Sequence, residues 1–217
     1  ATFLTDDPPE HPFLALVVSG GHTALYHAKA PLQYALVGQT RDDAAGEAFD
    51  KVAKLLGLGF PGGPVIERVS ADGDPKLVTF PLAQMSDGAP DFSFSGLKTS
   101  VSLYVKRRAL LGRGEIADVA ASFQAAVVKM VVRKTVKAAL HHGVKRVVLT
   151  GGVAANGPLR RGLEQAALEH GLRLHIPPRS LCTDNAAMIT AAGTARLAAG
   201  IRAPLTLNAI PDLALAG

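Results

Sequence analysis

The stretch from Leu14 to Thr23, with the sequence LALVVSGGHT, constrains the fold of this chain more than any other. Its five apolar residues, two of them β-branched, are typical of a buried strand. Ser19-Gly20-Gly21 then turns the chain, and residues 23–27 alternate weakly, which predicts a return strand. Because the two glycines carry no Cβ, an anion can approach the backbone amides of this turn closely. A purely structural hairpin turn is the alternative at this point, since glycine turns are common.

The rest of the chain alternates strands with helices, which predicts an α/β fold. The expected elements after the hairpin are a strand at 33–38, helices at 42–56, 65–70, from 91–99 to about 108 and 116–142, a strand at 145–150, a helix at 158–170, a strand at 172–176 and a helix ending near 200. Three helix starts are also predicted: Thr40 or Asp42 caps the helix at 42–56, Pro64 opens the next as its first residue, and Thr183 or Asp184 caps the last.

A second glycine turn follows the strand at 145–150. Gly151-Gly152 leads into a helix that Pro158 opens. A strand, a glycine pair and a helix N-terminus suit a nucleotide, because the unpaired amides and the helix dipole face the turn; a routine tight turn is the alternative. The P-loop and Rossmann glycine patterns do not occur in the sequence. Two such turns favour a nucleotide-binding lobe similar to those of actin-like and sugar-kinase ATPases.

The helix at 42–56 also carries an acidic stripe. Asp43, Glu47, Asp50 and Lys54 share one face at helical spacing. The three carboxylates should repel one another unless a cation, a hydroxyl or an amine lies opposite them. An acidic face in contact with solvent is the alternative.

Charge and cysteine content limit the partners and the compartment. The chain has a formal net charge of +5, with basic clusters at 106–108, 145–146 and 160–161. These clusters are either solvated helix faces or part of a surface for an RNA backbone. No apolar run is long enough for a membrane helix, so we expect no membrane contact. The single cysteine, Cys182, favours a reducing compartment such as the cytoplasm.

Six motifs in order resemble the TsaD family, the tRNA N6-adenosine threonylcarbamoyltransferases. They are VVSGGHT at 17–23, DDAAGEAFDK at 42–51, FPGGP at 60–64, DFSFSGLKT at 91–99, GGVAAN at 151–156 and CTDNAAM at 182–188. The resemblance covers about residues 13–200.

This resemblance implies an actin-like (ASKHA, ribonuclease H-like) α/β fold with an inserted helical segment. It implies transfer of the threonylcarbamoyl group from threonylcarbamoyl-AMP to N6 of the adenosine 3′ to the anticodon in tRNAs that read ANN codons. The implied domains are a linker or truncated end at 1–12, a C-terminal lobe at 13–200 with a helical insertion at about 57–118, and a tail at 201–217. The implied site comprises Val17, Val18, Ser19, Gly20 and Gly21 along the adenylate, Asp50 and Gly63 on its nucleoside side, Asn156 at the adenosine pocket and Asp184 as a ligand to iron or zinc.

The chain departs from the family in one respect. The family holds its metal with a His-x-x-x-His pair upstream of the first glycine turn as well as with the late aspartate, and that pair does not occur in this sequence. The chain is therefore expected to be a fragment, a polypeptide that needs its other lobe from elsewhere, or a degenerate paralogue. On each interpretation we expect the isolated chain to be nearly inactive and to self-associate through an apolar lobe face.

The resemblance implies tRNA and TsaB-like and TsaE-like subunits as partners, and the apolar lobe face predicts a second copy of the chain as a further one. Two other functions compete with the transferase. One is an actin-like small-molecule kinase or ATPase, which would share the glycine turns. The other is a non-catalytic scaffold similar to the TsaB paralogues, against which the retention of all six motifs argues.

Overall fold

A computed structural model describes residues 1–83, 85, 87–108 and 111–209 of the chain. The strands are β1 (Phe13–Val18), β2 (Thr23–Ala30), β3 (Gln33–Gln39), β4 (Arg146–Thr150) and β5 (Arg173–His175). The α-helices are α1 (Ala45–Leu55), α2 (Gly62–Ser70), α3 (Ser95–Lys106), α4 (Arg113–His141), α5 (Gly157–Glu169) and α6 (Ala186–Ala198). Short 3-10 helices are η1 (Thr2–Leu4), η2 (Gly152–Ala155) and η3 (Arg179–Leu181).

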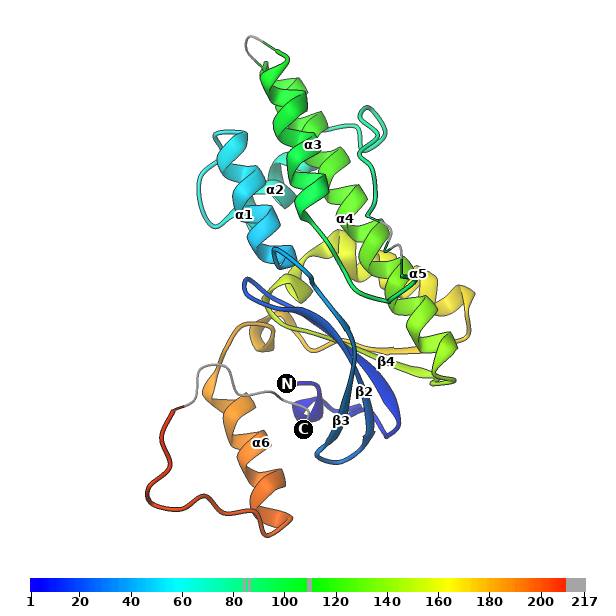
Figure 1. The fold of residues 1–217 in the computed structure, drawn as a ribbon, viewed down its shortest axis with the longest axis vertical. Coiled ribbons are helices and arrows are strands. Elements are labelled where there is room, and N and C mark those ends of the chain that lie inside the picture. The colour runs from blue at the N-terminus through cyan, green and yellow to red at the C-terminus, as the bar shows by residue number, and fades with distance from the viewer. Residues whose placement is uncertain (84, 86, 109–110, 210–217) are drawn as a thin grey trace.

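The strands form one mixed sheet in the order β3-β2-β1-β4-β5 (Figure 1). The first three strands are the antiparallel meander that the sequence predicts. β1, β4 and β5 run parallel to one another, and Val17 lies opposite Thr150 in the register. Because parallel strands end at the same edge of a sheet, the glycine turns after β1 and β4 are neighbours.

Successive side chains of β1 point to opposite faces of the sheet. Leu14, Leu16 and Val18 are completely buried in the main core, together with Phe49 of α1 and Phe123 of α4. The rings of these two phenylalanines meet edge to face at 5.3 Å. Helices α1 to α5 lie on one side of the sheet, as Figure 1 shows, and α6 lies on the other side beside η1.

Helix α6 is exposed along its length. None of its residues is buried, and Ile189 and Leu197 are 75% and 54% exposed. Within the described part of the chain, no helix is both long enough and apolar enough to cross a membrane. The tail expected at 201–217 falls partly outside the described residues, which end at 209.

Three predicted helix starts are wrong, because each helix begins at a different residue or is capped by a different group. Helix α1 begins at Ala45, whose amide donates to Thr23 Oγ1 of β2, 2.8 Å away, and neither Thr40 nor Asp42 caps it. Pro64 is the third residue of α2 rather than its first. The cap of α6 is Asn185, whose side chain accepts from the amide of Met188, and not Thr183 or Asp184.

Candidate functional site

The second glycine turn contacts the end of β1, directly before the first glycine turn. Gly151 has φ +98°, a backbone conformation that favours glycine, and a Cβ placed on it would lie 2.3 Å from the carbonyl oxygen of Val18. Only a glycine at this position lets the second turn approach the first so closely. The structure therefore brings Ser19–Gly21 and Gly151 together, as the predicted nucleotide site requires.

Backbone hydrogen bonds stabilise the first turn, and the space beside its two glycines is open. The amide of Ser19 donates to the carbonyl of His22 at 2.8 Å, and the amide of Gly46 at the start of α1 donates to the Ser19 carbonyl at 3.1 Å. A Cβ on Gly46 would come within 2.7 Å of that carbonyl oxygen, so α1 packs directly on the turn. A Cβ on Gly20 or Gly21 would meet nothing within 4 Å. Space beside both glycines is therefore open to a ligand.

Val17 and Val18 point to opposite faces of the sheet. The side chain of Val18 is fully buried in the core, whereas Val17 is half-buried on the other face. The side chain of Val18 is therefore closed to a ligand, whereas that of Val17 is partly accessible on the face opposite the main core. The resemblance implies that both residues line the adenylate and does not distinguish them.

Asp50 and Gly63 lie around a second part of the site, where α1 meets the start of α2. Asp50 Oδ1 accepts from the amide of Gly62 at 2.7 Å, which fixes the start of α2. Asp50 also lines an open hollow of about 510 Å³ next to Lys54 and Phe60, and Phe60 is 82% exposed. The second carboxylate oxygen of Asp50 has no partner among the described residues. The hollow thus combines an available carboxylate oxygen with an exposed aromatic ring.

The other carboxylates of the acidic stripe are neutralised by lysines. Asp43 pairs with Lys51 at 2.6 Å and with Lys98 of α3 at 3.2 Å, and Glu47 pairs with Lys51 at 2.7 Å. Burial alone would raise the pKa of Asp43, but the hydrogen bonds and positive charges of the two lysines outweigh it and lower that pKa. The predicted repulsion is therefore relieved by cations, one of the options that the sequence left open.

Asn156 lies behind the second turn and is only 7% exposed. Its Oδ1 accepts from the amide of Leu159 at 3.0 Å, and its Nδ2 donates to Gln124 at 2.9 Å and Glu67 at 3.2 Å. Glu67 also accepts from the amide of Gly157 at 3.0 Å. The expectation that the α5 amides are free for a ligand is therefore wrong for these two amides, because side chains already occupy them.

Glu67 is a residue of this region that sequence reasoning missed. It lies on α2 and reaches across to the start of α5, far along the chain. A Cβ on Gly157 would lie 2.9 Å from Glu67 Oε1 and 3.1 Å from a guanidinium nitrogen of Arg161. The only trace in the sequence is a glutamate three residues after Pro64, which looks like an ordinary exposed helix position.

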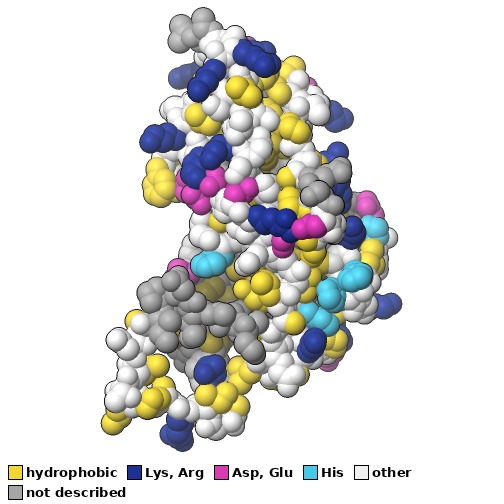
Figure 2. Space-filling view, viewed as in Figure 1, with side chains coloured by type: hydrophobic (Ala, Val, Ile, Leu, Met, Phe, Trp, Pro, Cys, Tyr) yellow, Lys and Arg dark blue, Asp and Glu magenta, His cyan; other side chains and the backbone are white. Residues whose placement is uncertain are grey.

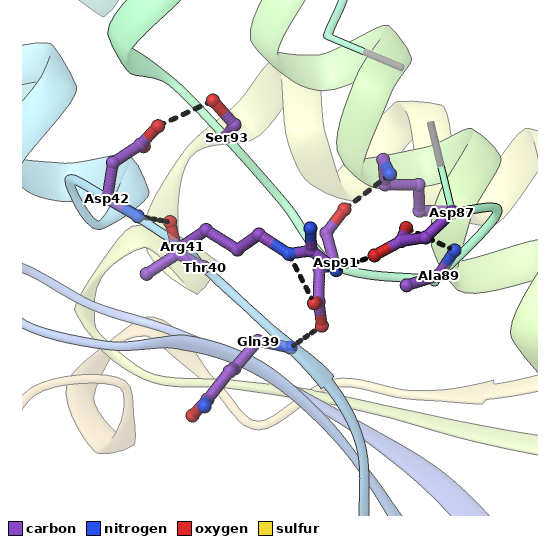
Figure 3. Close-up of polar contacts among 9 residues, drawn as sticks. Gln39, Thr40, Arg41, Asp42, Asp87, Ala89, Asp91 and Ser93 are labelled. Atoms are coloured by element: carbon purple, nitrogen blue, oxygen red, sulfur yellow. Dashed lines mark hydrogen bonds and ion pairs between the residues drawn. The ribbon is translucent and has the colours of Figure 1, made fainter. Parts of the chain in front are cut away.

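Hydrogen bonds and an ion pair to the carboxylates of Asp91 and Asp42 connect the motif at 91–99 with the end of β3 (Figure 3). Asp91 accepts from the amide of Gln39 at 2.9 Å and from Arg41 Nε at 2.7 Å. Asp42 accepts from Ser93 Oγ at 2.5 Å and from the amide of Phe94 at 2.8 Å. Burial raises the pKa of Asp42, yet these hydrogen bonds together with those from Ser95 leave it lowered. The motifs at 42–51 and 91–99 thus form one structural unit next to the first turn.

Asp184 is exposed and lies just before the cap of α6. No group of three or more His, Cys, Asp or Glu side chains that could hold a metal ion occurs in the described ranges. A single carboxylate does not fit the three or four ligands that a protein-bound iron or zinc needs. The described residues therefore do not form the metal site that the resemblance implies.

Comparison with known proteins agrees with the motifs. The family model described as TsaD, tRNA N6-adenosine threonylcarbamoyltransferase, matches residues 1–191. A protein of that name from Symbiobacterium thermophilum is 54% identical over 215 residues, which are 99% of this chain and 63% of that protein. One from Anaeromyxobacter dehalogenans strain 2CP-1 is 52% identical over 212 residues, 97% of this chain and 64% of the relative. The chain thus spans less than two thirds of the length of these relatives.

Among solved structures, the chain is similar to full-length HypF in a phosphate- and nucleotide-bound form. The TM-score is 0.66 at 12% identity, and the match covers 90% of this chain and 34% of HypF. At this identity the likeness concerns the fold alone. It confirms the predicted ASKHA-type α/β architecture.

Proposed function

Since the chain belongs to the TsaD family of tRNA N6-adenosine threonylcarbamoyltransferases, we propose that it carries the adenylate-binding half of such an enzyme. The substrates are threonylcarbamoyl-AMP and a tRNA that reads ANN codons. The observation that carries the proposal is the contact between the two glycine turns at Val18 and Gly151. It supports a site in which one bound nucleotide touches both turns.

The proposed reaction is an acyl transfer. The N6 nitrogen of the tRNA adenosine attacks the threonylcarbamoyl carbonyl carbon, the bond from that carbon to the phosphate oxygen breaks, and AMP leaves. The N6 nitrogen gives up one proton, which passes to water. Uncommitted amides of the Ser19–Gly21 turn hold the phosphate, which glycine turns can do without a lysine. In this scheme the turn stabilises the charge that collects on the leaving phosphate.

We assign the nucleoside to the hollow beside Asp50. Asp50 Oδ1 is engaged with Gly62, so Oδ2 is the atom that accepts from a ribose hydroxyl. The exposed ring of Phe60 offers a face on which a base can stack. Val17 and Gly63 border the bound adenylate, and Asn156 supports the pocket by holding the start of α5.

We further propose the domain organisation expected from the sequence: a linker or truncated end at 1–12, the C-terminal lobe at 13–200 with its insertion at about 57–118, and a tail at 201–217. A metal ion, iron or zinc, would require ligands beyond the described residues in addition to Asp184, and no step above passes through it. TsaB-like and TsaE-like subunits, or a second copy of the chain, are the proposed protein partners in a cytoplasmic assembly. The exposed apolar side chains of α6 support such an association.

Isothermal titration calorimetry of the chain with threonylcarbamoyl-AMP, AMP and ATP tests the proposal. We expect one site that binds the threonylcarbamoyl adenylate and AMP. ATP should bind more weakly, because the turn is assigned a single phosphate and ATP carries two more. Preference for ATP together with release of phosphate would instead indicate an actin-like kinase or ATPase. Failure to bind any of the three nucleotides would contradict an adenylate site on this chain.

A further inference from the structure

A row of basic side chains follows the exposed face of α4. Lys129, Arg133, Lys137 and His141 recur every four residues, and all four are exposed. Side chains at this spacing are neighbours on a helix surface, with Cβ atoms about 5–6 Å apart. Like charges at this spacing destabilise a helix unless something neutralises them.

The surrounding sequence supplies no counter-charge. Residues 119–163 contain no aspartate or glutamate, although eight lysines and arginines occur there. Among the described residues, none of the salt bridges involves Lys129, Arg133 or Lys137. Glu169 of α5 lines the same groove as these three residues but forms a salt bridge with none of them, so the row keeps a net positive charge.

Lys134 adds a buried cation beside this row. Its Nζ donates to the backbone carbonyl of Asp91, and the residue is only 9% exposed. Burial lowers the pKa of Lys134, and the charges of Arg133, Lys137 and Arg41 lower it further, against the attraction of Asp91. The carboxylates of Asp87 and Asp91 are already engaged by Arg41 (Figure 3). The local field is therefore positive despite these two acids.

A hollow of about 570 Å³ opens where this row meets the segment at 88–90. Its basic lining comprises Arg133, Lys134, Lys137, His141 and His142. The ring centroids of His27 and His142 lie 5.1 Å apart. The buried Nε2 of His27 has no hydrogen-bond partner among the described residues. Figure 2 shows histidine side chains in a row on this part of the surface, next to basic ones. An oxyanion in the hollow would face several donors at once.

We propose that the row Lys129, Arg133, Lys137 and His141, with the hollow beside it, binds backbone phosphates of the tRNA substrate. The inference rests on the proposed function, which brings tRNA to the chain. Phosphates succeed one another along an RNA strand, and the evenly spaced cations Lys129, Arg133 and Lys137 can neutralise a series of them, with the His141 ring as a hydrogen-bonding neighbour. The contacts are to the backbone, so they position the tRNA without reading its sequence.

The test is tRNA binding by the chain as a function of salt. The double variant Arg133→Gln/Lys137→Gln is compared with Lys76→Gln/Arg196→Gln, which removes the same charge at exposed positions elsewhere. Fluorescence anisotropy with an unmodified ANN-reading tRNA is measured between roughly 50 and 200 mM salt, a range over which backbone contacts dominate the salt dependence. Circular dichroism verifies that both variants fold.

We expect the Arg133/Lys137 variant to lose about tenfold in affinity, and its slope of log K against log salt to shrink by roughly 1.4 to 1.8 for two lost phosphate contacts. The control should retain the wild-type slope. Equal slopes for both variants, or a wild-type affinity in the first, overturn the row as the RNA surface and favour an acidic protein there. If the wild type binds the adenylate but no tRNA, the row is also refuted while the adenylate site stands. If the wild type binds neither the adenylate nor tRNA, that result counts against the proposed function itself.

Discussion

Gly151 lies against the backbone of Val18, so closely that any side chain on Gly151 would collide with the Val18 carbonyl oxygen. Val18 ends β1, and Gly151 directly follows β4, the parallel neighbour of β1. This contact brings the two glycine turns together and defines one edge of the candidate site.

Replacement of Gly151 by alanine is expected to destabilise the fold. The new Cβ would lie 2.3 Å from the carbonyl oxygen of Val18, at a φ of +98° that L side chains rarely adopt. We expect a loss of roughly 2–3 kcal/mol in the free energy of unfolding, measured by urea titration. Gly152→Ala is the matched control, because a Cβ there meets nothing within 4 Å. Equal stability of the two variants would show that the turns do not touch as described.

Asp50 has two separable roles, one for each carboxylate oxygen. Asp50→Asn keeps an oxygen for the Gly62 amide, so its melting temperature should stay near wild type while nucleoside binding weakens. Asp50→Ala leaves that buried amide without an acceptor and should lose about 1–3 kcal/mol of stability as well. Thermal melting and AMP titration of both variants check this. Wild-type AMP affinity in Asp50→Asn would contradict the assignment of Oδ2 to the ribose.

Acid should weaken the junction between α1 and α3. The folded-state pKa of Asp43 is lowered by its bonds to Lys51 and Lys98 despite its burial. Its contribution to stability is therefore complete above the unfolded-state pKa of about 3.9 and is lost as the pH falls through the lower folded-state value. Asp43→Asn should be less stable than wild type at pH 7, and urea titrations at decreasing pH should show this difference shrinking once the pH falls below the unfolded-state pKa. A difference that stays constant in acid would contradict this explanation.

Asp184 alone should hold a metal weakly. We expect the chain to retain well below one equivalent of iron or zinc after dialysis, and Asp184→Asn to retain the same amount. Elemental analysis by mass spectrometry measures both. One full equivalent in the wild type, lost in Asp184→Asn, would show that the chain completes a metal site around this aspartate and would contradict the expectation.

The strands and helices followed from local pattern. Five apolar residues before Ser19 and the periodicity of the helix at 42–56 were sufficient to predict β1 and α1. The helix starts were not predictable, because the acceptor for Ala45 is Thr23, which lies on a different strand. Propensity near a helix end cannot reveal a cap that comes from elsewhere in the chain.

For the candidate site, the sequence predicts both glycine turns, and the parallel pairing of β1 with β4 places the ends of the two strands next to each other. The partners of the side chains around them could not be predicted from the sequence. Glu67 is distant in sequence from its partners Asn156 and Gly157. Lys98 of α3, which pairs with Asp43, is also distant from it in sequence. Such contacts depend on the packing of helices, which one sequence does not specify.

The most direct test of the adenylate site is the substitution of Gly20 by valine. A Cβ on Gly20 meets no protein atom within 4 Å, so the fold should be unaffected, while the added side chain would fill the space that we assign to the phosphate. Gly193→Val on α6, also in open space, is the control. Calorimetry with threonylcarbamoyl-AMP should show binding reduced at least about a hundredfold in Gly20→Val, on the order of 3 kcal/mol, and unchanged in the control. Wild-type affinity in Gly20→Val, with both variants folded, would contradict the account.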